Sequence, residues 1–285
     1  MNSRTLERTI AAVGTSDGAG VRLRRSLGNT QGQRLDPFLM LDEFSSANPD
    51  DYVAGFPPHP HRGFETVTYM LDGRMRHEES IGNRGDLGPG DVQWMRAARG
   101  IIHSEMPQQQ EGRMRGFQLW VNLPARDKMR PAWYRDVPAA QIPLAALEGG
   151  GEALVILGAL AQGATVTTGA VQVVSAATLY ADVHLPPGAN CAIPVAATDN
   201  AMAYVYEGEA AFGPAAAAVV RRHAALLGGG EIVAARAGAQ GARFLLLAGV
   251  PLGEPVVQYG PFVMNTREQI ERALADYQAG TLGRA

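Results

Sequence analysis

The stretch that decides the fold is GFPPHPHRGFETVTYML, residues 55–71. It places His59 and His61 two positions apart and continues into the alternating, β-rich run 64–71. Further along, IHSE at residues 102–105 repeats the two-residue spacing with one histidine and one carboxylate. In an extended segment, residues i and i+2 point to the same face. Each pair can therefore direct two side chains into one barrel interior.

These side chains have the chemistry of a metal site. Three imidazoles and one carboxylate suit a divalent first-row metal, and at an octahedral ion they would leave two positions for substrate and dioxygen. A lone His-Pro-His is more typical of a turn with surface histidines. Two same-face pairs in a β-rich context, each a few residues after a glycine, favour metal binding instead.

Composition narrows the class of protein. The chain has 285 residues with a net charge of −3, which argues against nucleic acid as the main partner. No stretch approaches the ~18 consecutive apolar residues of a membrane-spanning helix, and the start lacks an apolar signal-peptide core. The single cysteine, Cys191, cannot form an intrachain disulfide, which fits a reducing compartment. We therefore expect a soluble, cytoplasmic protein with no membrane partner.

Frequent turns and short runs predict an all-β sandwich or barrel. The 34 glycines and 18 prolines separate runs of strand length. These runs cover residues 64–71, 91–95, 116–123, 153–157, 171–185, 202–206 and 243–250. One helix is expected over residues 267–279, because Thr266 and Gln269 form a capping-box pattern and Gly280 supplies a stop.

The chain contains an internal repeat. YMLDG at residues 69–73 is matched by YVYEG at 204–208, 135 residues later, and both predict a hairpin with an acidic-glycine turn. The repeat favours two similar barrels joined within residues 138–151. We expect an N-terminal metal-binding barrel over residues 1–140 and a C-terminal barrel over residues 150–285 that ends in the helix.

At these residues the sequence resembles the pirin family of bicupins, and the resemblance covers nearly the whole chain. It is carried by HPHRGFETV (59–67), PGDVQWM (89–95), RGIIHSEMP (99–107), QLWVNLP (118–124) and YGPFVMN (259–265). The resemblance implies two cupin (jelly-roll) β-barrels in tandem with a C-terminal α-helix. It also implies that His59, His61, His103 and Glu105 bind one metal, most often Fe(2+), in the N-terminal cupin. Cu, Ni, Co, Mn or Zn would accept the same ligands.

The second barrel is expected to hold no metal, as the family implies and the repeat supports. At the 135-residue offset, the four ligand positions correspond to Pro194, Ala196, Gly238 and Gln240, none of them a histidine or an acidic residue.

Several other polar residues receive structural interpretations. Glu65 lies where general cupins carry a glutamate ligand, but it is better explained as a supporting strand residue. His77, beside two glutamates, is expected to be solvated. His184 and His223 belong to no ligand motif and are expected to be structural. Arg62 should point to the face opposite His61 if the strand is regular.

The family implies a function as a dioxygenase that opens the ring of a flavonol such as quercetin and releases carbon monoxide. Glu105 would be the general base, and Phe56, just before the histidine pair, would line the substrate pocket. Two alternatives stay open: a non-enzymatic, metal- or redox-dependent regulator that binds a protein partner, and another cupin enzyme acting on a different small molecule.

Overall fold

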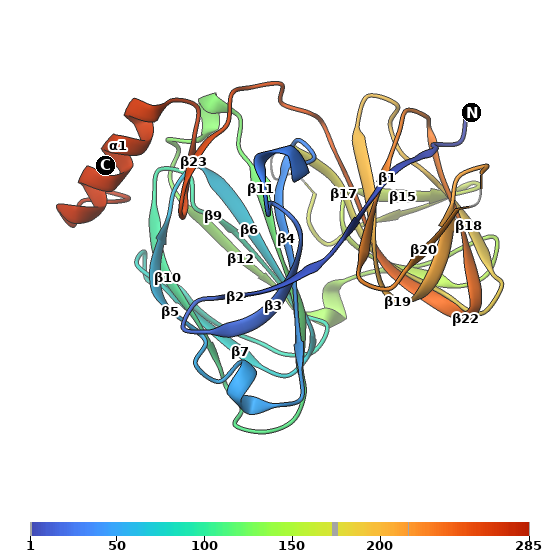
Figure 1. Cartoon of the computed structure of the whole chain (residues 1–285), viewed down its shortest axis with the longest axis horizontal. Helices are drawn as coiled ribbons and strands as arrows, with labels where there is room; N and C mark the ends of the chain where they lie inside the picture. The colour runs from blue at the N-terminus through green and yellow to red at the C-terminus, as the bar shows by residue number, and fades with distance from the viewer. Residues whose placement is uncertain (1, 173–175, 216, 285) are drawn as a thin grey trace. The chain divides into compact units, whose positions relative to one another are not determined.

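The computed structural model describes residues 2–172, 176–215 and 217–284, and most of its regular structure is β-strand (Figure 1). Within these residues, α1 (Arg267–Gln278) is the one α-helix, and it is too short to cross a membrane. The expected all-β class with a C-terminal helix is confirmed. Thr266 caps α1 by accepting from the Gln269 backbone N–H, and the Gln269 side chain completes the capping box.

The chain forms two units, each assembled from separate segments. Among the described residues, the N-terminal barrel unit comprises residues 14–25, 38–139 and 252–284, and the C-terminal barrel unit comprises those within residues 2–13, 26–37 and 140–251. The sequence analysis assigns α1 to the C-terminal barrel, whereas the structure groups residues 252–284, which include α1, with the N-terminal barrel unit.

Two sheets build the N-terminal barrel unit. The larger has the strand order β12-β9-β6-β11-β4-β3-β2, and the smaller has the order β5-β10-β7-β8. The strands of the larger sheet are β2 (Val13–Asp17), β3 (Val21–Leu27), β4 (Phe38–Ser46), β6 (Phe64–Asp72), β9 (Val92–Arg96), β11 (Met114–Asn122) and β12 (Trp133–Val137). Those of the smaller sheet are β5 (Phe56–His61), β7 (Met75–Glu79), β8 (Arg84–Leu87) and β10 (Ile101–Pro107).

An apolar cluster joins these two sheets at one end of the interior. Met70 of β6 and Phe44 of β4 pack in the same cluster as Met75 of β7 and Leu87 of β8. Apolar area removed from water contributes roughly 25 cal/mol per Å², so this cluster holds the sheets face to face. The polar side chains of the candidate site are thereby fixed on rigid strands.

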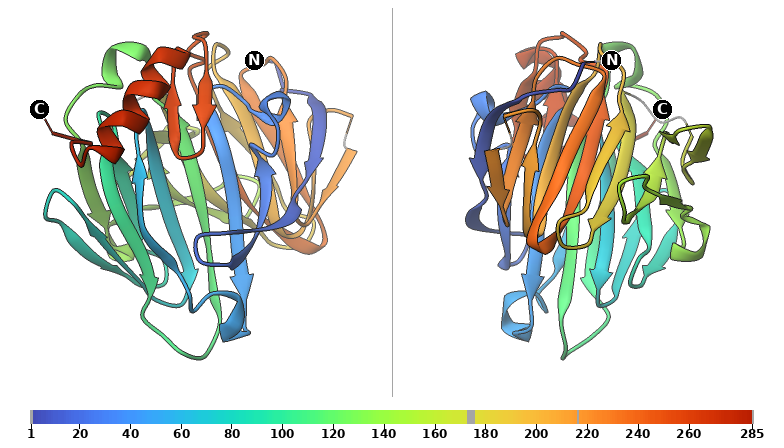
Figure 2. Two further views of the ribbon diagram at one scale, coloured as in Figure 1. Left: turned by 60° about the vertical axis from the view of Figure 1, so that its left-hand side comes forward. Right: turned by 90° about the vertical axis from the view of Figure 1, so that its right-hand side faces the viewer.

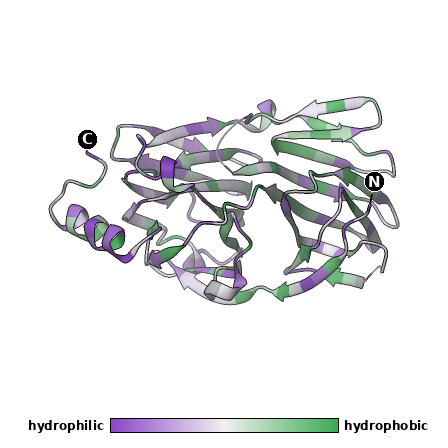
Figure 3. Cartoon of the chain, turned by 90° about the horizontal axis from the view of Figure 1, so that it is seen from above, coloured by the Kyte–Doolittle hydropathy of each residue, from purple (hydrophilic) through white to green (hydrophobic). Residues whose placement is uncertain are grey.

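The C-terminal segment adds a hairpin and the helix to the same unit. Strands β23 (Val257–Tyr259) and β24 (Phe262–Met264) pair with each other, and α1 packs against them through Ile270 and Ala273 (Figure 2, left). Hydrophilic and hydrophobic residues both occur along α1 (Figure 3), as expected for a helix with one buried face.

The C-terminal barrel unit is formed by one sheet of nine strands with a closed apolar interior. The main path has the order β1-β21-β19-β22-β17-β14-β13, with β18 paired to β22 and β20 paired to β19. Its strands are β1 (Leu6–Ala11), β13 (Leu144–Ala146), β14 (Glu152–Leu157), β17 (Ala177–Leu185), β18 (Asn190–Pro194), β19 (Asn200–Phe212), β20 (Ala217–Val220), β21 (His223–Leu227) and β22 (Ile232–Gly249). A separate pair, β15 (Ala159–Gln162) and β16 (Thr165–Thr168), completes the unit.

The expected strand runs correspond to β6, β9, β11, β14, β17, β19 and β22. The run 171–185 includes residues 173–175, which lie outside the described part of the chain.

Both expected hairpins are wrong. The turn at Gly73 connects β6 to β7, which belong to different sheets, so the chain crosses the barrel there. Gly208 lies inside β19, where the register with β22 shifts on both sides and φ is +64°. A glycine at positive φ serves a bulge as well as a turn, so the acidic-glycine pattern does not distinguish them.

Candidate metal centre

Neighbouring strands of the smaller sheet bring the three predicted histidines together. β5 carries His59 and His61, and β10 pairs with it so that His103 lies opposite His59. The two-residue spacing on β5 puts both of its imidazoles on the inner face, as the sequence predicts. The ring centroids of the three histidines lie 4.3–4.8 Å apart. His61 and His103 are buried, and His59 is half-buried.

The nitrogen atoms of these rings converge. The Nε2 atoms of His59 and His61 are 3.1 Å apart, and each of the three histidines has a ligand atom within 4.8 Å of the others. His59 Nδ1 donates to the Pro57 carbonyl at 2.9 Å when it carries the ring proton, which leaves a lone pair on Nε2. Neighbouring donors at an octahedral ion with bonds of ~2.1 Å are about 3 Å apart. The His59–His61 spacing therefore matches two adjacent corners of a coordination sphere.

Glu105 lies two residues beyond His103 on β10 and is also buried. The Thr68 hydroxyl on β6 is 2.9 Å from Glu105 Oε1 and 2.6 Å from Gln118 Oε1. Because a hydroxyl has one proton, Thr68 donates to one of these oxygens at a time. The larger sheet thus fixes the orientation of a carboxylate that belongs to the smaller sheet.

Burial dominates the electrostatics of the cluster. It lowers the pKa of His61 and of His103 well below the ordinary value, and the neighbouring histidines lower it further. Burial also raises the pKa of Glu105, against the opposing effects of His59 and the Thr68 hydrogen bond. Neutral imidazoles and a carboxylate are the forms that bind a cation.

The donor set fits a divalent metal. The buried His103 Nε2 makes no hydrogen bond among the described residues. Two Nε2 lone pairs facing each other at 3.1 Å repel unless a proton or a cation lies between them. Imidazole and carboxylate ligands suit first-row transition metals. The site therefore has the donors, the spacing and the unsatisfied nitrogen that such an ion would use.

His77 is the residue that the sequence interpretation missed. Its side chain was expected to be solvated, but it is fully buried in β7. Its Nδ1 lies 3.3 Å from His103 Nδ1, and burial lowers its pKa to about 4. The sequence does indicate this burial, because Met75 and His77 alternate with the more polar Arg76 and Glu78. The adjacent glutamates led to the opposite interpretation, that His77 is solvated.

Three other predicted residues lie outside the cluster. Glu65 is buried and accepts from Trp94 Nε1 and Arg96 Nε, as expected of a supporting strand residue. Arg62 points away from His61 and binds Asp276 of α1, so its expected orientation is confirmed. Phe56 opposes Glu105 in the β5–β10 ladder and packs on the apolar cluster that joins the sheets.

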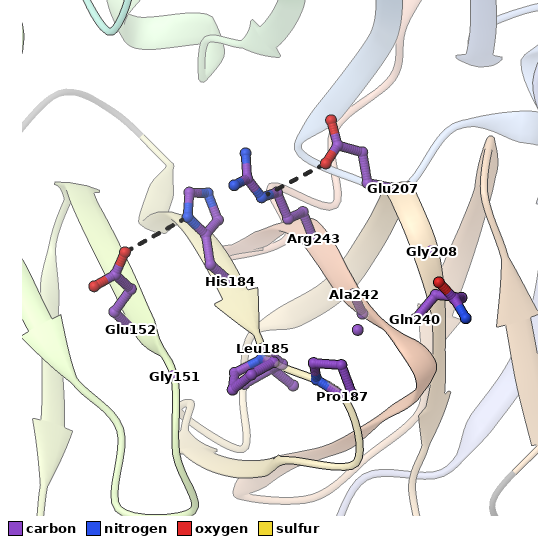
Figure 4. Close-up of a pocket in the computed structure, with 12 residues that line it drawn as sticks. Gly151, Glu152, His184, Leu185, Pro187, Glu207, Gly208, Gln240, Ala242 and Arg243 are labelled. Atoms are coloured by element: carbon purple, nitrogen blue, oxygen red, sulfur yellow. Dashed lines mark ion pairs between the residues drawn. The ribbon is translucent and has the colours of Figure 1, made fainter.

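The C-terminal barrel unit carries a second group of polar residues, in a pocket of about 600 Å³ (Figure 4). A row of cross-strand neighbours borders it, formed by Glu152, His184, Arg243 and Glu207 on β14, β17, β22 and β19. Glu152 lies 3.8 Å from His184 Nδ1, and Glu207 lies 3.6 Å from Arg243 Nε. Glu207 and Arg243 form a cross-strand ion pair, and Glu152 and His184 are neighbours in the same row.

His184 has partners that the sequence interpretation did not anticipate. Its Nε2 is 3.0 Å from Asp182 Oδ2 and 3.1 Å from the Tyr206 hydroxyl. Tyr206 in turn donates to Asp182 Oδ1 at 2.6 Å, within the buried part of β17 and β19. The imidazole is therefore anchored by residues on its own and another strand of the barrel.

Comparison with known proteins gives matches in both halves of the chain. The Pirin family model matches residues 20–121, and the model of the Pirin C-terminal cupin domain matches residues 180–283. The first match lies in the N-terminal half of the chain and the second in the C-terminal half.

Individual relatives match almost end to end. A pirin-like protein of Caulobacter vibrioides is 52% identical over 93% of this chain and 94% of its own length. Human pirin is 42% identical over 92% of this chain and 88% of its own. The crystal structure of quercetin 2,3-dioxygenase from Acinetobacter baumannii superimposes with a TM-score of 0.86 at 32% identity and covers 99% of both chains.

Proposed function

Because this chain belongs to the pirin family of bicupins, we propose that it is a metal-dependent dioxygenase that cleaves a flavonol such as quercetin. The observation that carries the proposal is the convergence of three histidines beside the buried Glu105. The likeness to the quercetin 2,3-dioxygenase of A. baumannii supports the same reaction class.

In this proposal, His59, His61, His103 and Glu105 hold one divalent metal, with Fe(2+) as the first candidate. When bound, such a metal supplies Lewis acidity toward the flavonol oxygens and redox capacity toward dioxygen. The imidazoles are neutral, so Glu105 contributes the one negative charge and the site keeps a positive field for an anionic substrate. Phe56 is proposed to contact the flat rings of the substrate.

Glu105 is proposed to accept the proton of the flavonol 3-hydroxyl and to return it to the ring-opened product. Glu105 is buried and lies beside the three histidines, so its carboxylate is available to a hydroxyl bound at the site. The Thr68 hydrogen bond to Oε1 holds the group in one orientation while the proton moves. Dioxygen adds two oxygen atoms to the substrate, and one ring carbon leaves as carbon monoxide.

The test is oxygen consumption and carbon monoxide release with quercetin. The protein as isolated is analysed for metals, then stripped and reloaded with Fe(2+), Cu, Ni, Co or Mn. We expect turnover with at least one metal, loss of metal binding in His59→Ala, and no change in His223→Gln. Glu105→Gln should lose turnover by about 10²–10⁴-fold while still binding metal.

Two results would overturn the proposal. One is the absence of oxygen uptake with quercetin for every metal that the protein binds, which would favour the regulator or another cupin chemistry. The other is full turnover in a metal-loaded Glu105→Gln variant.

A further inference from the structure

His77 is positioned to control the ring of His103. β7 pairs with β10 so that His77 lies opposite Glu105, two pairs along the ladder from His103 and therefore on the same face. The two imidazoles face each other through their Nδ1 atoms at 3.3 Å, with ring centroids 5.0 Å apart. Both rings are buried, with exposed fractions of 0% for His77 and 2% for His103.

The proton between the two Nδ1 atoms determines which nitrogen of His103 can bind metal. If His77 donates it, the neutral His103 carries its own proton on Nε2, and Nε2 cannot be a ligand. If His103 donates it, Nε2 keeps a free lone pair. The Nε2 atoms of His103 and His77 are both buried without a hydrogen-bond partner among the described residues, but of these two rings His103 is the one whose ligand atom lies within 4.8 Å of those of His59 and His61.

We propose that His77 is a positioning residue: its Nδ1 accepts the Nδ1–H of His103, fixes that ring's orientation and tautomer, and so presents Nε2 to the metal. This inference rests on the proposed metal site and adds a fifth side chain to it. Metal-bound histidines generally donate their second N–H to an acceptor, and loss of that acceptor typically weakens metal binding 10–100-fold.

A competing assignment makes His77 itself a ligand. Ligand atoms of His77, His103 and Glu105 also lie within 4.8 Å of one another. In that arrangement, the 3.3 Å between the His77 and His103 Nδ1 atoms would be the spacing of two ligand atoms, with no proton shared between them. The two assignments differ in how many imidazoles bind the ion, so an experiment separates them.

The first test uses metal-free protein with ¹⁵N-labelled histidine and reads the His103 tautomer by long-range ¹H–¹⁵N NMR. We expect the proton on Nδ1 in the wild type. In His77→Phe, which cannot accept a hydrogen bond, this preference should be lost. His103 protonated on Nε2 in the wild type would overturn the proposal whatever the protein's enzymatic activity.

The second test measures Co²⁺ affinity by calorimetry and counts imidazole ligands by X-ray absorption. His77→Phe should bind Co²⁺ 10–100-fold more weakly. His77→Gln, whose amide oxygen accepts a hydrogen bond, should restore affinity to within a few-fold of wild type with the same number of imidazoles. Tyr134→Phe is the packing control, because the Tyr134 ring lies against His77, tilted by 31° with ring centroids 5.0 Å apart.

The possible results distinguish a failure of the positioning role from a failure of the proposed metal site. Equal affinity in His77→Phe and wild type leaves the metal site intact but overturns the positioning role. Loss of one imidazole from the ion in His77→Gln makes His77 a ligand and also overturns it. Failure of the wild type to bind any metal overturns this inference together with the proposed function.

Discussion

The hydroxyl of Thr68 on β6 is 2.9 Å from the Glu105 carboxylate on β10, which joins the two sheets of the N-terminal barrel unit at the candidate site. Thr68→Val keeps the side-chain shape and removes this hydrogen bond. We expect metal affinity to fall about 10–100-fold, because Glu105 loses the partner that orients it. Calorimetric titration with Co²⁺ measures the change.

Thr66→Val is the matched control for this substitution. Thr66 lies two residues earlier on β6, is also buried and points to the same side of the strand. An equal loss of affinity in both variants would indicate that a general change in packing, rather than the bond to Glu105, weakens the site.

Much of the site could be predicted from sequence because its determinants are local. The alternation of a strand places His59 with His61, and His103 with Glu105, without any knowledge of tertiary structure. Capping of α1 by Thr266 is equally local. The contact of His77 with His103 could not be predicted in this way, because it depends on the pairing of β7 with β10, which lies about 25 residues further along the chain.

The sequence pattern also could not predict which distant segments of the chain assemble into each unit. β1 lies near the start of the chain but pairs with β21 of the C-terminal barrel unit. The C-terminal residues, in turn, contribute β24, which includes Val263. The Val263 carbonyl lies so close to Gly63 that a Cβ added at residue 63 would collide with it. Such pairings depend on complementary surfaces between distant segments, which composition and periodicity do not encode.

Metal binding should stabilise the protein, and chelation should reverse this. A ligand that binds only the folded state adds about 2.7 kcal/mol to the unfolding free energy at 100 times its Kd. We expect Tm to rise on addition of Co²⁺ and to return after chelation. His61→Ala should abolish the shift, whereas His223→Gln, in the other unit, should retain it. A shift of the same size in His61→Ala would place the responsible ion elsewhere.

The ion pair between Arg62 and Asp276 should stabilise the docking of α1. Arg62 is 3% exposed at its side chain, and its Nη1 donates to Asp276 Oδ2 at 2.8 Å. Asp276→Ala leaves the buried guanidinium without its counter-charge, so we expect the unfolding free energy to fall by about 1–3 kcal/mol. Urea denaturation measures this, and hydrogen exchange should show faster opening of α1.

Glu271→Ala provides the control on the same helix, because Glu271 is exposed. Its effect should stay within about 0.5 kcal/mol. A similar small effect in Asp276→Ala would mean that the aspartate contributes no more than an ordinary surface charge.

Lys128 is the only lysine of the chain, and it is buried in the N-terminal barrel unit with 1% exposure. Its Nζ donates to the carbonyls of Gly63 and Val263 at 2.6 and 3.0 Å and to Asn122 Oδ1 at 2.6 Å. Burial lowers its pKa to about 7, against the opposing charge of Glu254. Protein labelled with ¹³Cε-lysine should therefore give one lysine resonance that titrates near pH 7.

The same shift predicts how stability depends on pH. Above pH 7 the folded protein releases the Lys128 proton, whereas the unfolded chain keeps it up to about pH 10.4. The unfolded state therefore binds more protons in this range, and the unfolding free energy rises with pH. Between pH 7 and 8.5 this gain should reach about 1.5 kcal/mol in the unfolding free energy. The window ends there because the buried thiol of Cys191, with its pKa raised to about 12, opposes the trend at higher pH. Lys128→Met should remove the gain in urea denaturation, and an unchanged pH dependence in that variant would assign it to other groups.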